Sequence, residues 1–209
     1  MKTFEDYMLD MNQHKNFRDW YEYVEENNKD TKGKIGDNYK IKTPLTKSKA
    51  NIYLQEFIDL IDLPSTAPKV IKAIENIGIK LPEKLPKGEY VIEDYEDELD
   101  LKIILNQKEN QENLLFNMIA TWKVCKCIYP LGISKEDSYK QLVEKIGKPA
   151  KYKWKHSSTT YVWKLTNKNS NKYIIEIDLD KNLKGISSFT IESFDSFDAD
   201  RKEDYIELE

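Results

Sequence analysis

Apolar residues in the first third of the chain recur every three or four positions, the spacing of amphipathic helices. This pattern predicts a helix over 4–24, a second over 47–60 that stops before Pro64, and a third that starts at Ser65 or Thr66 and ends at Gly78. The residues expected to face inward in the second and third helices are Ile52, Phe57, Ile58, Ile61, Val70, Ile71, Ile74 and Ile77.

Two connections separate these helices from each other and from the later part of the chain. Residues 29–44 hold two glycines, a proline and several lysines, which is typical of a mobile connection open to proteolysis. Pro82 and Pro86 rigidify a short linker, because each proline fixes its own φ and disfavours helix in the residue before it. We expect a subdomain boundary at that linker.

Beyond Pro86 the period changes from about 3.6 to 2, the period of strands. Residues 99–105 and 114–124 alternate apolar and polar positions around the polar stretch NQKENQEN, which predicts a long β-hairpin. The second limb also fits a helical spacing through Leu114, Leu115, Met118, Ile119 and Trp122, so helix stays open as an alternative.

The last third predicts one helix followed by a sheet. Ser134 opens the helix, Asp137 stands at the capping-box position, and Gly147 ends it. Three strands are expected, beginning at Tyr161, Tyr173 and Ile186, and forming an antiparallel sheet. Acidic residues and serine dominate after residue 193, where we expect a short helix or a partly ordered tail.

These elements predict an α+β fold, with a helical N-terminal part followed by an antiparallel sheet and one packed helix. The expected division is a helical subdomain over 1–80, an α+β subdomain over 87–192 and an acidic tail over 193–209.

Composition places the chain among globular proteins. Of 209 residues, 33% are charged and 39% hydrophobic, enough for a core without disulfides or metals. The start, MKTFEDYMLDMN, has acids where a signal peptide needs basic residues, and no later stretch approaches eighteen apolar residues. We therefore expect a cytoplasmic protein that does not span a membrane.

The candidate metal and cofactor chemistry is sparse. Cys125 and Cys127 are the only cysteines, and their i, i+2 spacing disfavours a disulfide, so two reduced thiols are expected. A C-x-C pair can join a metal site, but His14 and His156 are too distant to complete a recognisable ligand set. No cofactor and no metal are predicted.

The sequence also shows no familiar catalytic motif, so we do not expect an enzyme. The glycines of GKIGD lack the flanking strand and lysine of a phosphate loop. His156 lies beside hydroxyl residues in KWKHSSTT, and acidic residues are abundant, which leaves an enzyme of unfamiliar design as one alternative.

Charge is unevenly distributed, although the net charge is only −4. Residues 148–172 carry seven lysines and no acid, and KYKWKH within them alternates lysines with aromatics. Exposed aromatics among lysines would suit stacking on single-stranded nucleic acid, whereas a core position for Tyr152 and Trp154 is the simpler interpretation. The pI of about 5.5 also makes a nucleic-acid partner less favoured.

An opposite run, residues 89–100, carries seven acids and no base. Its composition is typical either of a hydrated edge or of a surface that docks a basic protein, where carboxylates steer encounter and tyrosines supply affinity. The candidate partner-binding residues in this run and in the tail are Glu89, Tyr90, Glu93, Asp94, Tyr95, Glu96, Asp97, Glu98, Asp195, Asp198 and Asp200.

Residues 130–192 contain PLGISKEDSYKQLVEKIGKPAKY, YVWKL and YIIEIDLDKNLKGISSFTIE. This stretch resembles the helix-then-hairpin module of β-lactamase-inhibitor-like proteins and of small outer-membrane-assembly lipoproteins, a resemblance that implies a fold more than a function. The lysine-, asparagine- and isoleucine-rich chain as a whole also resembles bacterial toxin-immunity proteins. That resemblance implies a non-enzymatic protein that binds and neutralises a cognate toxin, for which a basic nuclease domain is one candidate; the alternative is a nucleic-acid-associated accessory protein.

Overall fold

The computed structural model describes residues 52–94, 100–108, 111–122, 125–182 and 185–208, which belong to one compact unit. The helix predicted over 4–24 and the connection predicted over 29–44 lie outside these residues. So do Tyr95, Glu96, Asp97 and Glu98.

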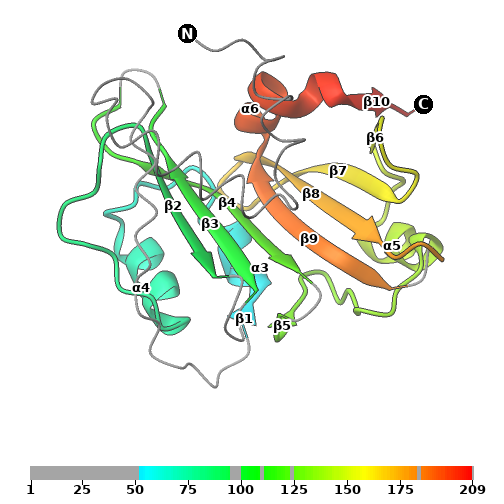
Figure 1. Ribbon diagram of the computed structural model, residues 1–209, viewed down its shortest axis with the longest axis horizontal. Helices are drawn as coiled ribbons and strands as arrows, with labels where there is room; N and C mark the ends of the chain where they lie inside the picture. The colour runs from blue at the N-terminus through cyan, green and yellow to red at the C-terminus, as the bar shows by residue number, and fades with distance from the viewer. Residues whose placement is uncertain (1–51, 95–99, 109–110, 123–124, 183–184, 209) are drawn as a thin grey trace, which may run out of the picture. The chain divides into compact units, whose positions relative to one another are not determined.

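Among the described residues, eight strands form one antiparallel sheet (Figure 1). From one edge to the other its strands are β10 (Tyr205–Glu207), β6 (Tyr152–Trp154), β7 (Thr160–Thr166), β8 (Lys172–Leu179), β9 (Ile186–Ser193), β4 (Leu115–Trp122), β3 (Leu101–Asn106) and β2 (Glu89–Asp94). The predicted antiparallel pairing of the last three long strands is confirmed. A separate parallel pair joins β1 (Ile52–Tyr53) to β5 (Cys127–Ile128).

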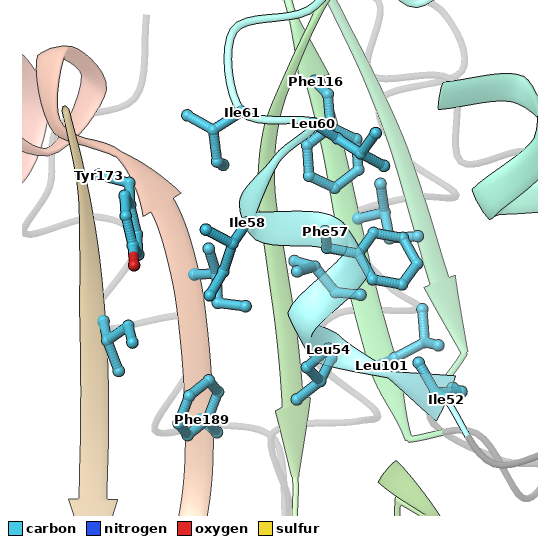
Figure 2. Close-up of a cluster of buried hydrophobic side chains, with 14 of the residues drawn as sticks. Ile52, Leu54, Phe57, Ile58, Leu60, Ile61, Leu101, Phe116, Tyr173 and Phe189 are labelled. Carbon is cyan, nitrogen blue, oxygen red and sulfur yellow. The ribbon is translucent and has the colours of Figure 1, made fainter. Parts of the chain in front are cut away.

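One face of the sheet, the first face, packs against three helices: α3 (Leu54–Ile58), α4 (Pro68–Asn76) and α5 (Tyr139–Ile146). Figure 2 shows α3 in this core, where the rings of Phe57 and Phe116 lie with their centroids 5.7 Å apart. Residues before and after the linker at Pro82 and Pro86 contribute to this single hydrophobic cluster. Those two prolines therefore do not separate two cores among the described residues.

The helix predicted over 47–60 is shorter than expected where the structure describes it. Ile52 and Tyr53 form a strand that pairs with β5, and α3 ends at Ile58. The predicted inward side of this segment is nevertheless confirmed, because Ile52, Phe57, Ile58 and Ile61 are all buried. The burial of apolar side chains determines which side of the segment faces the core, whereas pairing with β5 makes Ile52 and Tyr53 extended instead of helical.

The other two predicted helices differ in accuracy. For α4 the predicted end is confirmed, with Gly78 just past the last turn at a φ of 84°, but the helix starts at Pro68 rather than at Ser65 or Thr66. The last helix begins at Tyr139 rather than at Ser134, because Ser138 and Gln141 form the capping box. Asp137 instead accepts the backbone N–H of Ser134 at 2.7 Å.

The ambiguous segment 114–124 contains strand β4 and no helix within its described part. Its pairing with β3 shifts between Ile104 and Leu105, because Leu105 lies opposite Phe116 and Ile104 lies opposite Met118. Because of this bulge, Asn117 has no opposite residue in β3. Met118 consequently points to the other face of the sheet from Phe116. The single inward stripe predicted from Leu114 to Val124 is therefore wrong, and β4 is buried from both sides.

The opposite face of the sheet, the second face, is covered in part by the C-terminal segment 194–207. This segment consists of α6 (Phe194–Ser196), the π-helix η2 (Phe197–Arg201), the 3-10 helix η3 (Lys202–Asp204) and β10. It closes a second hydrophobic cluster made of Tyr152, Val162, Ile174, Phe194, Phe197 and Tyr205. Of the two alternatives expected after residue 193, the short helix is present as α6. The segment is an ordered covering layer rather than a partly ordered tail, and its last strand completes the sheet edge (Figure 1).

Within the described residues, no helix has the length and apolar character required to cross a membrane.

Candidate functional site: a carboxylate-lined pocket on the second face

The floor of a pocket is set by the register of three neighbouring strands. Asp178 of β8 lies between Thr160 of β7 and Ser188 of β9, its partners on either side. Side chains directly opposite in an antiparallel sheet share a face, so these three polar residues emerge together on the second face. The alternate residues Ile175 and Ile177 of β8 are buried in the main core.

The walls come from the edge of the sheet and from the C-terminal segment. Trp154 of β6 lies opposite Tyr205 of β10, and Arg201 and Asp204 precede that strand. The pocket has a volume of about 230 Å³. Its lining residues are Trp154, Thr160, Glu176, Asp178, Ser188, Arg201, Asp204 and Tyr205.

Arg201 anchors the C-terminal segment to the sheet through two carboxylates. Its guanidinium donates to Glu192 at 2.8 Å and to Glu176 at 2.7 Å, and also to the Tyr205 hydroxyl at 2.7 Å. The Tyr205 hydroxyl in turn donates to Glu176. The charge of Arg201 is therefore compensated inside the protein, and all three groups that it contacts hold it in place.

Burial is the largest cause of the pKa shifts of Glu192 and Tyr205 in this cluster. Glu192 is 4% exposed, and its burial, with repulsion from Glu176, raises its pKa to about 7 despite the opposing effect of Arg201. Burial also raises the pKa of Tyr205 above its ordinary value, with Glu176 as the next cause. The phenol therefore stays protonated and acts as the donor to Glu176.

Asp178 and Asp204 differ from Glu176 and Glu192 in having no cationic partner. Asp178 accepts hydrogen bonds from the hydroxyls of Thr159 and Thr160 at 2.8 and 2.9 Å, and from Ser187 at 2.9 Å. No described lysine, arginine or histidine forms an ion pair with Asp178 or with the exposed Asp204. The pocket thus carries two carboxylates whose charge no described residue neutralises.

Trp154 is the exposed aromatic residue of the pocket. It is 37% exposed, and its ring meets His156 edge-on with centroids 5.8 Å apart. The core position expected for both aromatics of KYKWKH is confirmed for Tyr152, which is 4% exposed, and is wrong for Trp154. An indole beside carboxylates offers a π-face and negative charge to the same ligand.

Comparison with known protein families, curated proteins and solved structures finds no match. The chemistry of the pocket must therefore be derived from its own residues. Among the described residues, no three His, Cys, Asp or Glu side chains gather in a metal-binding arrangement. The mixture of carboxylates, hydroxyls and an indole suits recognition of an organic cation.

The candidate residues of the acidic run that the structure describes lie away from this pocket. Glu89, Tyr90, Glu93 and Asp94 belong to β2, the strand at the opposite edge of the sheet from β10. Tyr90 is 2% exposed in the main core, so its side chain is not displayed on the surface. Glu93 forms an ion pair with Lys102 at 3.0 Å.

The three candidate residues of the tail lie on the segment that covers the second face. Asp195, Asp198 and Asp200 are exposed, and Asp195 pairs with Lys108 at 2.9 Å. Asp198 pairs with Lys202 at 2.5 Å. The structure therefore places the tail carboxylates on the segment that also supplies a wall of the pocket, while the β2 carboxylates lie at the far edge.

Several lysines of the basic segment 148–172 are engaged by the protein itself. Lys151 pairs with Glu207 at 2.6 Å, and Lys168 pairs with Asp59 at 2.5 Å. Lys148 donates to the backbone carbonyl of Lys164, and Lys155 donates to that of Glu203. Part of the charge segregation along the sequence is thus cancelled in the fold, which weakens a nucleic-acid role for these lysines.

The sequence interpretation missed Asp178, Arg201, Asp204 and Tyr205 as site residues. One signal was present: Glu176 and Asp178 are charged residues that alternate with Ile175, Ile177 and Leu179 in the sequence of this strand. The pocket itself depends on pairing between β6 and β10, strands that lie about fifty positions apart in the chain. No local pattern reports such a pairing.

Proposed function

We propose that this chain is a non-enzymatic protein-binding protein of the immunity type, and that it binds a basic toxin domain through the second face around the pocket. One observation carries the proposal: the exposed Trp154 lies in a pocket with Asp178 and Asp204, two carboxylates without a cationic partner among the described residues. This combination fits the chemistry of a binding site for a basic protein.

The physical properties of protein interfaces support this choice of surface. Tryptophan, tyrosine and arginine dominate binding energies when they are buried at the centre of an interface. Trp154 has surface left to bury, and the exposed Asp200 adds negative charge on the covering segment, where Asp195 and Asp198 are already paired with Lys108 and Lys202. Such charge increases the association rate with a basic partner and selects against acidic ones.

A basic nuclease domain would fit this surface because its substrate-binding face is positively charged. The complex would block that face and so neutralise the toxin in the cytoplasm of the producing cell. Electrostatic attraction is screened over about 8 Å at physiological ionic strength, so the association should weaken as salt is raised.

Affinity capture from the organism that encodes the chain tests the proposal. A stoichiometric partner that is toxic when expressed alone, and harmless when co-expressed with this chain, would support it. The variant Trp154→Ala should lose at least tenfold in affinity for that partner, whereas Tyr53→Ala should not, because Tyr53, although more exposed than Trp154, belongs to β1 and not to the pocket. Capture of nothing, or of nucleic acid alone, would count against the proposal.

A further inference from the structure

We propose that the pocket is a socket for one arginine side chain of the partner protein. This inference rests on the proposed function and specifies the chemical group that enters the pocket. Its basis is the meeting of Trp154, Asp178 and Asp204 around a volume of about 230 Å³. The occupant is a guanidinium group, which would lie against the indole and donate to the carboxylates.

The balance of charge decides between a cation and an anion. Arg201 is the cationic residue in the lining, and its guanidinium donates hydrogen bonds to Glu192 and Glu176 at 2.8 and 2.7 Å. An anion would have to compete with these two carboxylates for Arg201 and would also be repelled by Asp178 and Asp204. A cation would instead give those two residues the ion pairs that they lack among the described side chains.

The aromatic residue narrows the choice to an organic cation. A cation over the face of a tryptophan ring is attracted by the ring quadrupole, and tryptophan is the best of the aromatic residues for this contact. His156 meets Trp154 edge-on at an interplanar angle of 83°. The two rings are nearly perpendicular, so His156 does not stack flat on the indole.

Size and donor geometry favour arginine over a larger ligand and over lysine. Pockets for drug-sized ligands span roughly 300–1,000 Å³, so 230 Å³ suits a single side chain. A guanidinium is planar, stacks on aromatic rings and donates five hydrogen bonds in a fixed fork. The pocket offers several acceptors around its wall, namely two carboxylates and the Ser188 hydroxyl. The spread donors of a guanidinium can reach more of these acceptors than the compact ammonium group of a lysine.

Titration of the full chain with N-acetylarginine methylamide tests the socket directly. The probe should shift the indole N–H signal of Trp154 and the backbone amide signals of Ser188 and Tyr205, and saturate in the millimolar range. The neutral citrulline analogue has nearly the same shape and should bind at least tenfold more weakly. N-acetyllysine methylamide should also bind more weakly than the arginine compound.

Two variants and their controls complete the test. Asp204→Asn and Trp154→Ala should each weaken the arginine probe at least fivefold, as followed by the amide signals of Ser188. Asp204 is exposed and outside any described ion pair, so Asp204→Asn should leave the fold intact. Glu56→Gln, an exposed carboxylate of α3, and Tyr53→Ala should leave the probe affinity unchanged.

The outcomes separate the socket from the proposed function. Equal binding of citrulline, stronger binding of lysine, or shifts confined to other parts of the protein would overturn the arginine socket. If a toxic partner is captured and binds Trp154→Ala unchanged, the socket and the choice of the second face are wrong, and the immunity-type protein binding stands. If the arginine probe binds as expected and no partner is captured, the socket stands and the proposed function fails.

Discussion

The side-chain amide of Asn167 donates a hydrogen bond to the backbone carbonyl of Ile58 at 2.9 Å, across 109 positions of sequence. Its side-chain oxygen accepts the backbone N–H groups of Asn169 and Asn171 at 2.9 and 3.0 Å. One buried side chain thus closes the turn between β7 and β8 and caps the last carbonyl of α3. This turn fixes the first-face helix to the strands that carry the pocket.

Asn167→Ala should therefore lower the free energy of unfolding by about 2–4 kcal/mol, because it leaves one carbonyl and two N–H groups without their partner. Urea denaturation of the wild type and the variant measures this loss. Asn169→Ala removes only an exposed contact with the carbonyl of Asp59 and should cost less than about 1 kcal/mol. Equal losses in the two variants would show that the buried amide has no special role.

Local patterns in the sequence predicted the elements whose burial is one-sided. Leu101, Ile103 and Leu105 alternate with partly exposed residues in β3, and the strand is where the alternation placed it. Gly147 ends α5 in the left-handed region at a φ of 83°, as expected of a glycine after the last turn. Period and turn chemistry act within a few residues, so one sequence suffices to detect them.

Elements that depend on distant partners were missed or misplaced. Strand β2 lies within the acidic run and was not predicted. In this strand the buried Tyr90 and Ile92 alternate with Glu89, Val91 and Glu93. The bulge at Asn117 is set by the register with β3 and not by the composition of β4. For the same reason the pocket could not be predicted, because its walls meet only once β10 pairs with β6.

A second prediction concerns the buried Glu192, whose pKa is raised to about 7 chiefly by burial. Between its ordinary value of 4.5 and about 7 the folded protein holds a proton that the unfolded chain has lost, so stability falls as the pH rises through this window. The shift corresponds to roughly 3 kcal/mol, at about 1.4 kcal/mol for each pKa unit. Below 4.5 and above 7 this group adds no slope.

Urea denaturation at pH values from 4 to 8 checks this, with Glu192→Gln as the partner variant. The unfolding free energy of the wild type minus that of the variant should fall as the pH rises from about 4.5 to 7 and then stay constant. Arg201 keeps its second carboxylate, Glu176, in the variant. A difference that is independent of pH would contradict the raised pKa of Glu192.

A third prediction concerns the two thiols, which are both free. The hydrogen bond from Cys125, supported by Thr121 and Tyr129 and opposed by burial, lowers the pKa of Cys127 from its ordinary value of 9.0 to about 7. The same hydrogen bond, followed by burial, raises the pKa of Cys125. Cys127 should therefore be the reactive thiol at neutral pH, because thiolates are the nucleophiles.

Alkylation with iodoacetamide, followed by peptide mass mapping, measures the two rates separately. The rate at Cys127 should reach half its maximum near pH 7 and exceed the rate at Cys125 throughout. Cys125→Ala removes the largest cause of the shift and should move the midpoint at Cys127 upward. A midpoint that does not move would show that Cys125 does not stabilise the thiolate.

The last prediction tests whether the C-terminal segment is part of the fold. Phe197 is fully buried, and its ring centroid lies 5.5 Å from that of Tyr152 and 5.0 Å from that of Tyr205. Phe197→Ala should lower the unfolding free energy by about 3–5 kcal/mol, because it leaves a cavity between the sheet and η2. It should also broaden the indole signal of Trp154, since loosening η2 and β10 removes one wall of the pocket.

The exposed Asp198→Ala should change stability by less than about 1 kcal/mol. A small effect of Phe197→Ala, with an unchanged Trp154 signal, would instead mean that residues 194–207 contribute little to the second face, and the pocket would then lack the rigid wall that binding requires.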